Sequence, residues 1–241
     1  MAAVGSPEEL GTLLGVWAHP DDETYLSAGL MAAAARSGCR VVCVTATRGE
    51  AGSQDEARWP LESLALVREA ELEAAFEILG VKEHEWLGYP DGGCHLVPEH
   101  EGAERLEKII AEVRPDSVLT FGPDGMTGHP DHKAVNAWTT SAFESSASAA
   151  AHLYYATVTP EWAEEMFVVA EPYNVFFDGY PSITPRHELA IDFTVPPDLL
   201  EVKWRAIVEQ TSQSEALIKA IGKEILQRFN DVETFAHAFS D

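Results

Sequence analysis

The chain contains no long apolar run, and this absence narrows where it can act. No stretch of its 241 residues approaches the roughly 20 consecutive apolar residues that a membrane-spanning helix needs. The segment 1–14 carries acidic residues where a signal peptide would carry basic ones. We therefore expect a cytoplasmic protein with no membrane partner.

Basic residues and cysteines are also scarce. Sixteen Lys and Arg stand against 40 Asp and Glu, a formal net charge of −24 that repels nucleic acid and anionic lipid. The three cysteines include no C-x-x-C pair and lie in or beside apolar segments, which predicts buried thiols and no disulfide framework: Cys39, Cys43 and Cys94. A small-molecule partner is expected instead of a nucleic acid.

Several common catalytic and nucleotide-binding motifs are missing as well. No G-x-G-x-x-G or G-x-x-x-x-G-K-[ST] follows an apolar strand pattern, which argues against a nucleotide-binding domain. No G-x-S-x-G element marks a serine hydrolase.

What the chain does contain is an alternation of buried strands and helices. Strands are predicted at 11–18, 40–47, 83–87, 117–121, 152–159 and 188–195, and helices at 23–37, 61–79, 99–113, from 132 to about 145, and as one or two closing helices over 197–229. This alternation predicts a Rossmann-like three-layer α/β/α fold with a mainly parallel sheet. We expect one domain over 1–241, with a core at about 12–150 and a divergent C-terminal region, about 151–241, that completes the fold and shapes the substrate pocket.

Two short motifs supply a candidate metal site. Ala18–Glu23 reads AHPDDE and Gly128–His132 reads GHPDH, and each follows an apolar run that predicts a strand. Catalytic zinc is typically held by three protein ligands, often histidines with one carboxylate, and keeps an open position for water. His19, Asp22 and His132 supply that set, because parallel strands deliver residues at their carboxyl ends to one edge of a sheet.

The remaining polar residues of the two motifs can carry the chemistry. Asp21 is left free to act as general base. His129 is a candidate acid or oxyanion stabiliser, and a neighbouring carboxylate such as Asp131 would favour its protonated form. Alternatively, each motif alone can be an ordinary sequence at the N-terminus of a helix, because Asp, Glu and Pro are favoured in a first helical turn.

At these residues the chain resembles the LmbE-like, or PIG-L, family of zinc-dependent N-deacetylases. The resemblance covers about residues 12–140 and includes three further segments: TRGEAG at 47–52, REAE at 68–71 and LGYPDG at 87–92. It implies zinc on His19, Asp22 and His132, with Asp21 as base. It also implies that His129 and Asp131 assist the oxyanion and the leaving amine.

The resemblance further implies that Arg68 and Asp91 bind the sugar. Each has a simpler interpretation: Arg68 as a solvated partner on a charged helix, and Asp91 as an ordinary residue of a Pro-Asp-Gly turn. The chain departs from the family at Thr127, where some relatives have a tyrosine. It departs again at 210–213, QTSQ, where many relatives have His-x-Ser-Gln.

The sequence thus predicts a zinc-dependent hydrolase that removes an N-acetyl or other N-acyl group from an amino sugar, with water on the metal as nucleophile. The metal is zinc or another divalent transition metal such as Fe²⁺. Alternatives are an amidase of a sugar conjugate or secondary metabolite, and a non-catalytic metal-dependent carbohydrate-binding protein. Calcium, the usual ion of such binding proteins, prefers oxygen ligands, so two histidines argue against the last. The sequence is compatible with a homo-oligomer and does not determine the oligomeric state.

Overall fold

One seven-stranded sheet organises the computed structural model, which describes residues 4–239 except 174 and 178–180. The strands are β1 (Leu13–Trp17), β2 (Val41–Thr45), β3 (Glu83–Trp86), β4 (Ser117–Phe121), β5 (His152–Ala156), β6 (Ile191–Thr194) and β7 (Val232–His237). Their order across the sheet is β3-β2-β1-β4-β5-β7-β6. The first five are parallel, and β7 runs antiparallel to both of its neighbours. The expected mainly parallel α/β sheet is confirmed.

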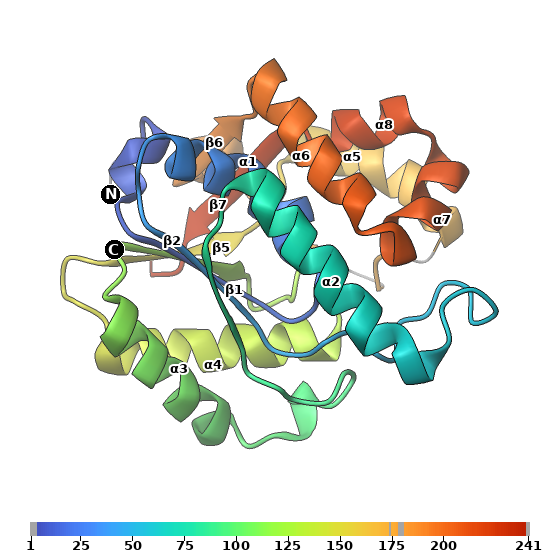
Figure 1. Ribbon diagram of the computed structural model, residues 1–241. Helices are drawn as coiled ribbons and strands as arrows, with labels where there is room; N and C mark the ends of the chain where they lie inside the picture. Colours follow the sequence, from blue (N-terminus) through green and yellow to red (C-terminus); the bar gives the residue numbers. More distant parts are fainter. Residues whose placement is uncertain (1–3, 174, 178–180, 240–241) are drawn as a thin grey trace.

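Helices cover both faces of this sheet (Figure 1). They are α1 (Asp22–Arg36), α2 (Leu61–Leu79), α3 (Glu99–Val113), α4 (Pro130–Ser146), α5 (Pro160–Ala170), α6 (Pro197–Glu209), α7 (Thr211–Ile221) and α8 (Lys223–Phe229). Helices α3 and α4 pack together on one face, and α1, α2 and α6 pack together on the other.

Local sequence explains the central elements. Every residue of β1, β2 and β4 is buried, as expected for a parallel sheet covered on both sides. Helix α2 ends at Gly80, whose φ of 78° is costly for other residues. The predicted ranges 61–79, 99–113 and 117–121 match α2, α3 and β4.

The C-terminal part differs from the prediction. Three helices, α6 to α8, occupy the region where one or two were expected, because the chain breaks at Gln210 and again at Gly222, where φ is 91°. Helix α5 and strand β7 were not predicted. The first begins in a segment rich in proline and aromatic residues, and the second contains the buried Glu233, which obscures its apolar pattern. Pro20 precedes α1, whereas Pro130 of the second motif is the first residue of α4.

A buried ion pair ties α1 to α6 and β7. Lys203 Nζ lies 2.7 Å from Glu233 Oε1, and neither side chain is exposed. The Glu233 carboxylate also accepts hydrogen bonds from the main-chain amides of Gly29 and Leu30, inside α1, and Lys203 donates to the carbonyl of Tyr25. Both members of this ion pair therefore also form hydrogen bonds with main-chain groups of α1.

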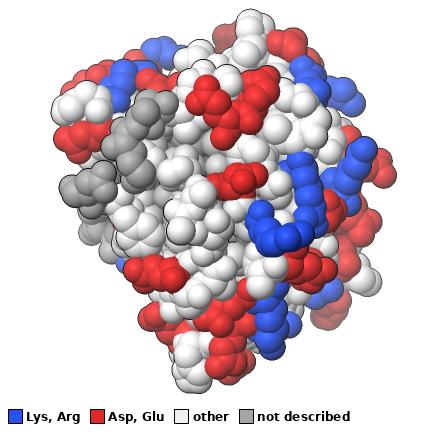
Figure 2. Space-filling view, turned by 90° about the vertical axis from the view of Figure 1, so that its left-hand side faces the viewer, with Lys and Arg blue, Asp and Glu red and all other residues white. Residues whose placement is uncertain are grey.

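The surface charge follows the composition. On the face shown in Figure 2, basic side chains lie among more numerous acidic ones, with no continuous basic patch. Several basic residues are paired, for example Arg36 with Asp198 and Arg40 with Glu83, each at 2.6 Å. Within the described ranges, no helix is long and apolar enough to span a bilayer.

The order of the strands creates a crevice at the carboxyl ends of β1 and β4. From β1 the chain moves outward to β2 and β3, and it then returns to the other side of β1 to form β4. The connections that leave the carboxyl ends of β1 and β4 therefore diverge, which opens a crevice at the point where open α/β sheets bind ligands.

Candidate metal centre

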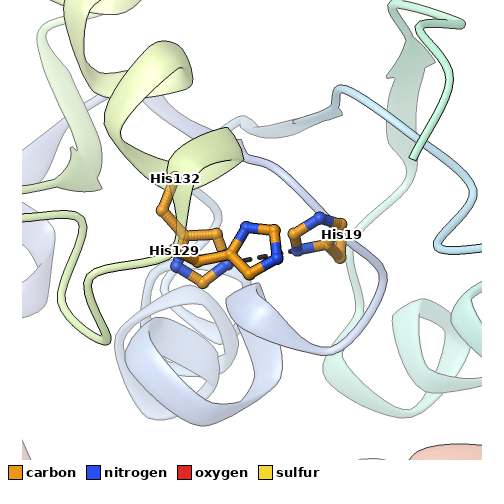
Figure 3. A group of neighbouring side chains, drawn as sticks. All are labelled: His19, His129 and His132. Carbon is orange, nitrogen blue, oxygen red and sulfur yellow. Dashed lines mark hydrogen bonds between the residues drawn. The ribbon is translucent and has the colours of Figure 1, made fainter. Parts of the chain in front are cut away.

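The two His-Pro-Asp motifs meet at this crevice. His19 lies in the loop after β1, Asp22 begins α1, and His132 lies in the first turn of α4. His19 Nδ1 is 3.1 Å from His132 Nε2 and 3.5 Å from Asp22 Oδ2, and His132 Nε2 is 3.4 Å from Asp22 Oδ1. Figure 3 shows the His19 and His132 rings joined by the first of these contacts, with His129 beside them. The structure thus brings together all three predicted ligands.

Contacts outside this cluster orient the His132 ring. Its Nδ1 lies 2.9 Å from the carbonyl oxygen of Gly125, which can only accept a hydrogen bond, so Nδ1 carries the proton. The ring stacks on Phe121 with centroids 4.1 Å apart. Nε2 therefore presents its lone pair to the cluster, as a metal ligand requires.

Two carboxylates hold His19 in the matching orientation. His19 Nε2 lies 3.1 Å from Asp91 Oδ1 and 3.5 Å from Asp131 Oδ2, which leaves Nδ1 facing His132. Asp131 is fully buried and accepts hydrogen bonds from the amides of Gly92 and Cys94 at 2.7 and 3.0 Å. Outer carboxylates of this kind fix the tautomer of a metal-binding histidine.

The electrostatics of the cluster favour a cation. Burial opposes charge on His19, but hydrogen bonds to Asp131, Asp22 and Asp91 raise its pKa well above the ordinary value. Burial lowers the pKa of His132 to about 4, so this second imidazole stays neutral. Three carboxylates thus surround a point where one positive charge is stabilised.

The spacing of the donor atoms also suits a metal. With zinc–ligand bonds of about 2.0–2.1 Å, tetrahedral ligand atoms lie about 3.3 Å apart. The two histidine nitrogens are 3.1 Å apart, His19 Nδ1 lies 3.5 Å from Asp22 Oδ2, and His132 Nε2 lies 3.4 Å from the other oxygen of Asp22, Oδ1. Two other sets have compatible spacing, His19 with His129 and His132, and His19 with Asp91 and Asp131. The residues around His19 can therefore hold a divalent metal ion.

The Asp21 side chain contacts Arg68. Its φ is 113°, an unusual value for a residue with a side chain. Asp21 Oδ1 lies 3.4 Å from Arg68 Nη2, and the side chain is 22 % exposed. Burial raises the pKa of Asp21 to about 7, although the positive charge of Arg68 opposes this shift. A carboxylate with a pKa near neutrality is suited to accept a proton.

Arg68 is buried, which corrects its interpretation as a solvated residue on a helix face. Only 4 % of it is exposed, and its guanidinium donates to the carbonyl oxygens of Gly49 and Pro20. Gly49 has a φ of 64°, and a Cβ at this position would overlap the guanidinium. Arg68 thus connects the loops after β1 and β2 and orients Asp21. Its contact with substrate stays a prediction.

His129 is placed beside the cluster but is not held protonated, contrary to expectation. It precedes the first turn of α4, with its ring centroid 4.9 Å from that of His19. Burial and the charge of His19 lower the pKa of His129 and outweigh Asp131, Asp22 and Asp91. The Nδ1 atom accepts a hydrogen bond from the Asp131 amide, so the neutral ring carries its proton on Nε2.

A large apolar cavity adjoins the cluster on one side, with a volume of about 280 Å³. Asp21, Asp22, Thr127 and His132 line its polar end, and the C-terminal region supplies most of the other walls. Thr127, which replaces the tyrosine of some relatives, also lies 3.4 Å from His132 Nδ1. The pocket-shaping role of residues after 151 stays a prediction that this placement supports.

Sequence reasoning missed several supporting residues. Phe121 and Gly125 orient His132, and no local motif marks them; Gly49 orients Arg68, and although it lies in the TRGEAG segment, that segment carried no role for it. Gln210, at the start of the departing QTSQ segment, is buried and donates to Glu23 and Thr24 beneath α1. It therefore supports the helix that begins with Asp22.

The fold and the site together define an α/β domain with a His-Asp-His cluster at the switch point of its sheet. The chain belongs to the PIG-L family: the family model described as "GlcNAc-PI de-N-acetylase" matches residues 14–143.

Among curated relatives, a 1D-myo-inositol 2-acetamido-2-deoxy-alpha-D-glucopyranoside deacetylase of Mycobacterium sp. (strain JLS) is 34% identical over 229 residues, which cover 83% of this chain and 73% of that one. A protein of the same name from Kineococcus radiotolerans is 37% identical over 152 residues, 52% of this chain and 42% of the relative. The chain spans about half the length of the first relatives that it matches.

Solved structures share the fold at lower identity. The zinc inhibited form of teicoplanin deacetylase Orf2 superposes with a TM-score of 0.69 at 20% identity, covering 94% of this chain and 97% of that one. GalB, a 4-carboxy-2-hydroxymuconate hydratase from Pseudomonas putida KT2440, reaches the same TM-score at 19% identity, covering 96% and 97%. Since a hydratase shares this fold, the fold alone does not define the reaction.

Proposed function

We propose that this protein is a zinc-dependent hydrolase that removes an N-acyl group from an amino sugar. The observation that carries the proposal is the cluster of His19, Asp22 and His132 beside the Arg68-bound Asp21. Membership of the PIG-L family and the deacetylase names of its relatives support the reaction type. Zinc is proposed because two imidazoles and one carboxylate are its typical ligands.

His19, Asp22 and His132 would hold the metal. A bound divalent cation supplies a Lewis acid that polarises the amide carbonyl and lowers the pKa of water. Asp91 and Asp131 keep the His19 ring in place through its Nε2 atom, and the Gly125 carbonyl does the same for His132.

The proton transfers fall to residues around this cluster. Asp21, which Arg68 holds in position, accepts a proton from the attacking water. His129, neutral with its proton on Nε2, donates a hydrogen bond to the developing oxyanion; a neutral imidazole can do this without being charged. Asp21, once protonated, can return the proton to the departing amine.

The test combines metal analysis with an assay for new primary amines. The purified protein is assayed with N-acetylglucosamine and with its inositol conjugate, the substrate class named for the Mycobacterium relative. We expect about one metal ion per chain and amine release that is lost with chelator and restored by zinc. Asp21→Asn should keep the metal but lower kcat by about 10²- to 10⁴-fold, whereas His19→Ala should lose both.

The matched control is Asp198→Asn, because the side chain of Asp198 is 70% exposed and belongs to a surface ion pair. Its activity should equal that of the wild type. Near full activity of metal-loaded Asp21→Asn would refute the general-base role. Sugar binding without amine release in the metal-loaded protein would instead support a carbohydrate-binding protein. The cytoplasmic location expected from the sequence stays a prediction.

A further inference from the structure

The apolar cavity is much larger than an acetyl group requires. Its volume is about 280 Å³, whereas one water molecule occupies about 30 Å³ in the liquid and an acetyl methyl is of similar size. The cavity is continuous with the metal cluster, because Asp22 and His132 form part of its wall. An occupant can therefore extend from the reacting carbonyl into this space.

The deeper walls are made of apolar side chains. Trp162 and Met166 come from α5, Leu217 from α7, and Leu226 and Phe229 from α8, with Phe121 near the metal cluster. The indole nitrogen of Trp162 already donates to the Phe229 carbonyl at 3.1 Å. These walls can exclude water from an alkyl chain, but they offer nothing that would bind sugar hydroxyls.

Four polar side chains in the wall are engaged with other protein groups. Thr157 Oγ1 lies 2.7 Å from the hydroxyl of Thr184, and Thr234 donates to the Thr157 carbonyl at 2.6 Å. Asn230 donates to the Leu226 carbonyl at 2.8 Å. Glu233 is occupied by Lys203 and by two amides of α1. A sugar placed here would find few hydrogen-bonding groups that are not already engaged, so it would recover only part of the hydrogen bonds that it loses to water.

Polar groups suited to the sugar lie elsewhere around the metal cluster. His129, Asp91 and His95 are not part of the cavity wall, and the His95 side chain is 44% exposed near Asp131. With the amide carbonyl at the cluster, its two substituents therefore meet different surroundings. One is an apolar cavity, and the other is a polar rim.

We propose that the cavity binds the acyl chain of the substrate, so that the enzyme cleaves N-acyl amino sugars with a chain of about eight carbons in preference to N-acetyl ones. The proposal rests on the proposed function, since it assumes amide hydrolysis at the metal cluster. It assigns the substrate class: an amino sugar bearing a medium-length fatty acyl group.

The experiment compares kcat/KM for N-acetyl-, N-butanoyl-, N-hexanoyl- and N-octanoyl-glucosamine with the zinc-loaded chain of 241 residues. Burial of each methylene should raise kcat/KM roughly three- to fourfold. We therefore expect kcat/KM for the N-octanoyl compound to exceed that for the N-acetyl compound at least 100-fold. Octanoate should also inhibit at a concentration at least tenfold lower than acetate does. This second measurement needs no variant.

Leu217→Trp fills the cavity and should lower the octanoyl-to-acetyl ratio of kcat/KM at least tenfold. The control Leu66→Trp makes the same change on α2, where Leu66 is 72% exposed and outside the cavity wall, and should leave that ratio unaltered. If the N-acetyl compound is cleaved as well as the N-octanoyl one, the inference is wrong while the proposed function stands. If neither these compounds nor the inositol conjugate of N-acetylglucosamine is cleaved, the proposed function itself fails. A preference for the octyl glycoside of N-acetylglucosamine over the N-octanoyl amide would place the aglycone in the cavity and overturn the acyl assignment.

Discussion

Replacing Lys203 by methionine should destabilise the protein strongly, because it leaves the Glu233 carboxylate buried without its counter-charge. The two groups are 2.7 Å apart and fully buried, and Lys203 also satisfies the carbonyl of Tyr25. Removal of one partner of a buried ion pair typically costs about 3–5 kcal/mol, and we expect a loss in this range. The measurement is the free energy of unfolding from urea denaturation at pH 7.

Two further variants separate the stranded charge from a general effect of the substitution. Lys219→Met removes a lysine that pairs with Glu215 at 2.8 Å on the surface, where it is 71% exposed, and should cost less than about 1 kcal/mol. The double variant Lys203→Met with Glu233→Gln should recover at least about 1 kcal/mol, because its remaining polar group is neutral. Equal losses for Lys203→Met and Lys219→Met, or no recovery in the double variant, would refute the reasoning.

Three other predictions concern the site, the pH dependence and the metal. Gly49→Ala forces a methyl group, at a φ of 64°, into the Arg68 guanidinium. It should lower the free energy of unfolding by about 1–3 kcal/mol and lower kcat in the amine-release assay. Unchanged values would contradict the role given to Arg68. Burial lowers the pKa of His84 to about 4, so the free energy of unfolding that depends on its neutral form is fully present above about pH 6.5 and is lost as the pH falls from there through 4. Over this interval, the free energy of unfolding of His84→Gln should fall by up to about 3 kcal/mol less than that of the wild type in parallel urea titrations. Identical pH profiles would count against this prediction. Chelation of the metal should lower Tm by about 5–10 °C in calorimetry if zinc is present at about 100 times its Kd, and an unchanged Tm would argue against a metal bound by the folded protein.

Local patterns in the sequence predicted much of the scaffold. The apolar runs of β1, β2 and β4 indicate buried parallel strands, and Gly80 marks the end of α2, since both signals are read within a few residues. The closing region was predicted less well. Gly222 divides α7 from α8, and β7 owes its pairing to β5 and β6 rather than to an alternating pattern of its own.

The sequence by itself determined the residue types of the site: two imidazoles and a carboxylate, in two motifs that each follow a buried strand. Their grouping within 3.5 Å, the burial of Arg68 against Asp21 and the neutral state of His129 were decided by tertiary structure. The apolar cavity was decided in the same way, since α5, α7 and α8 each supply only part of its wall. Burial and charge neighbours depend on contacts between distant segments, and a local pattern carries no information about which distant residues will be near.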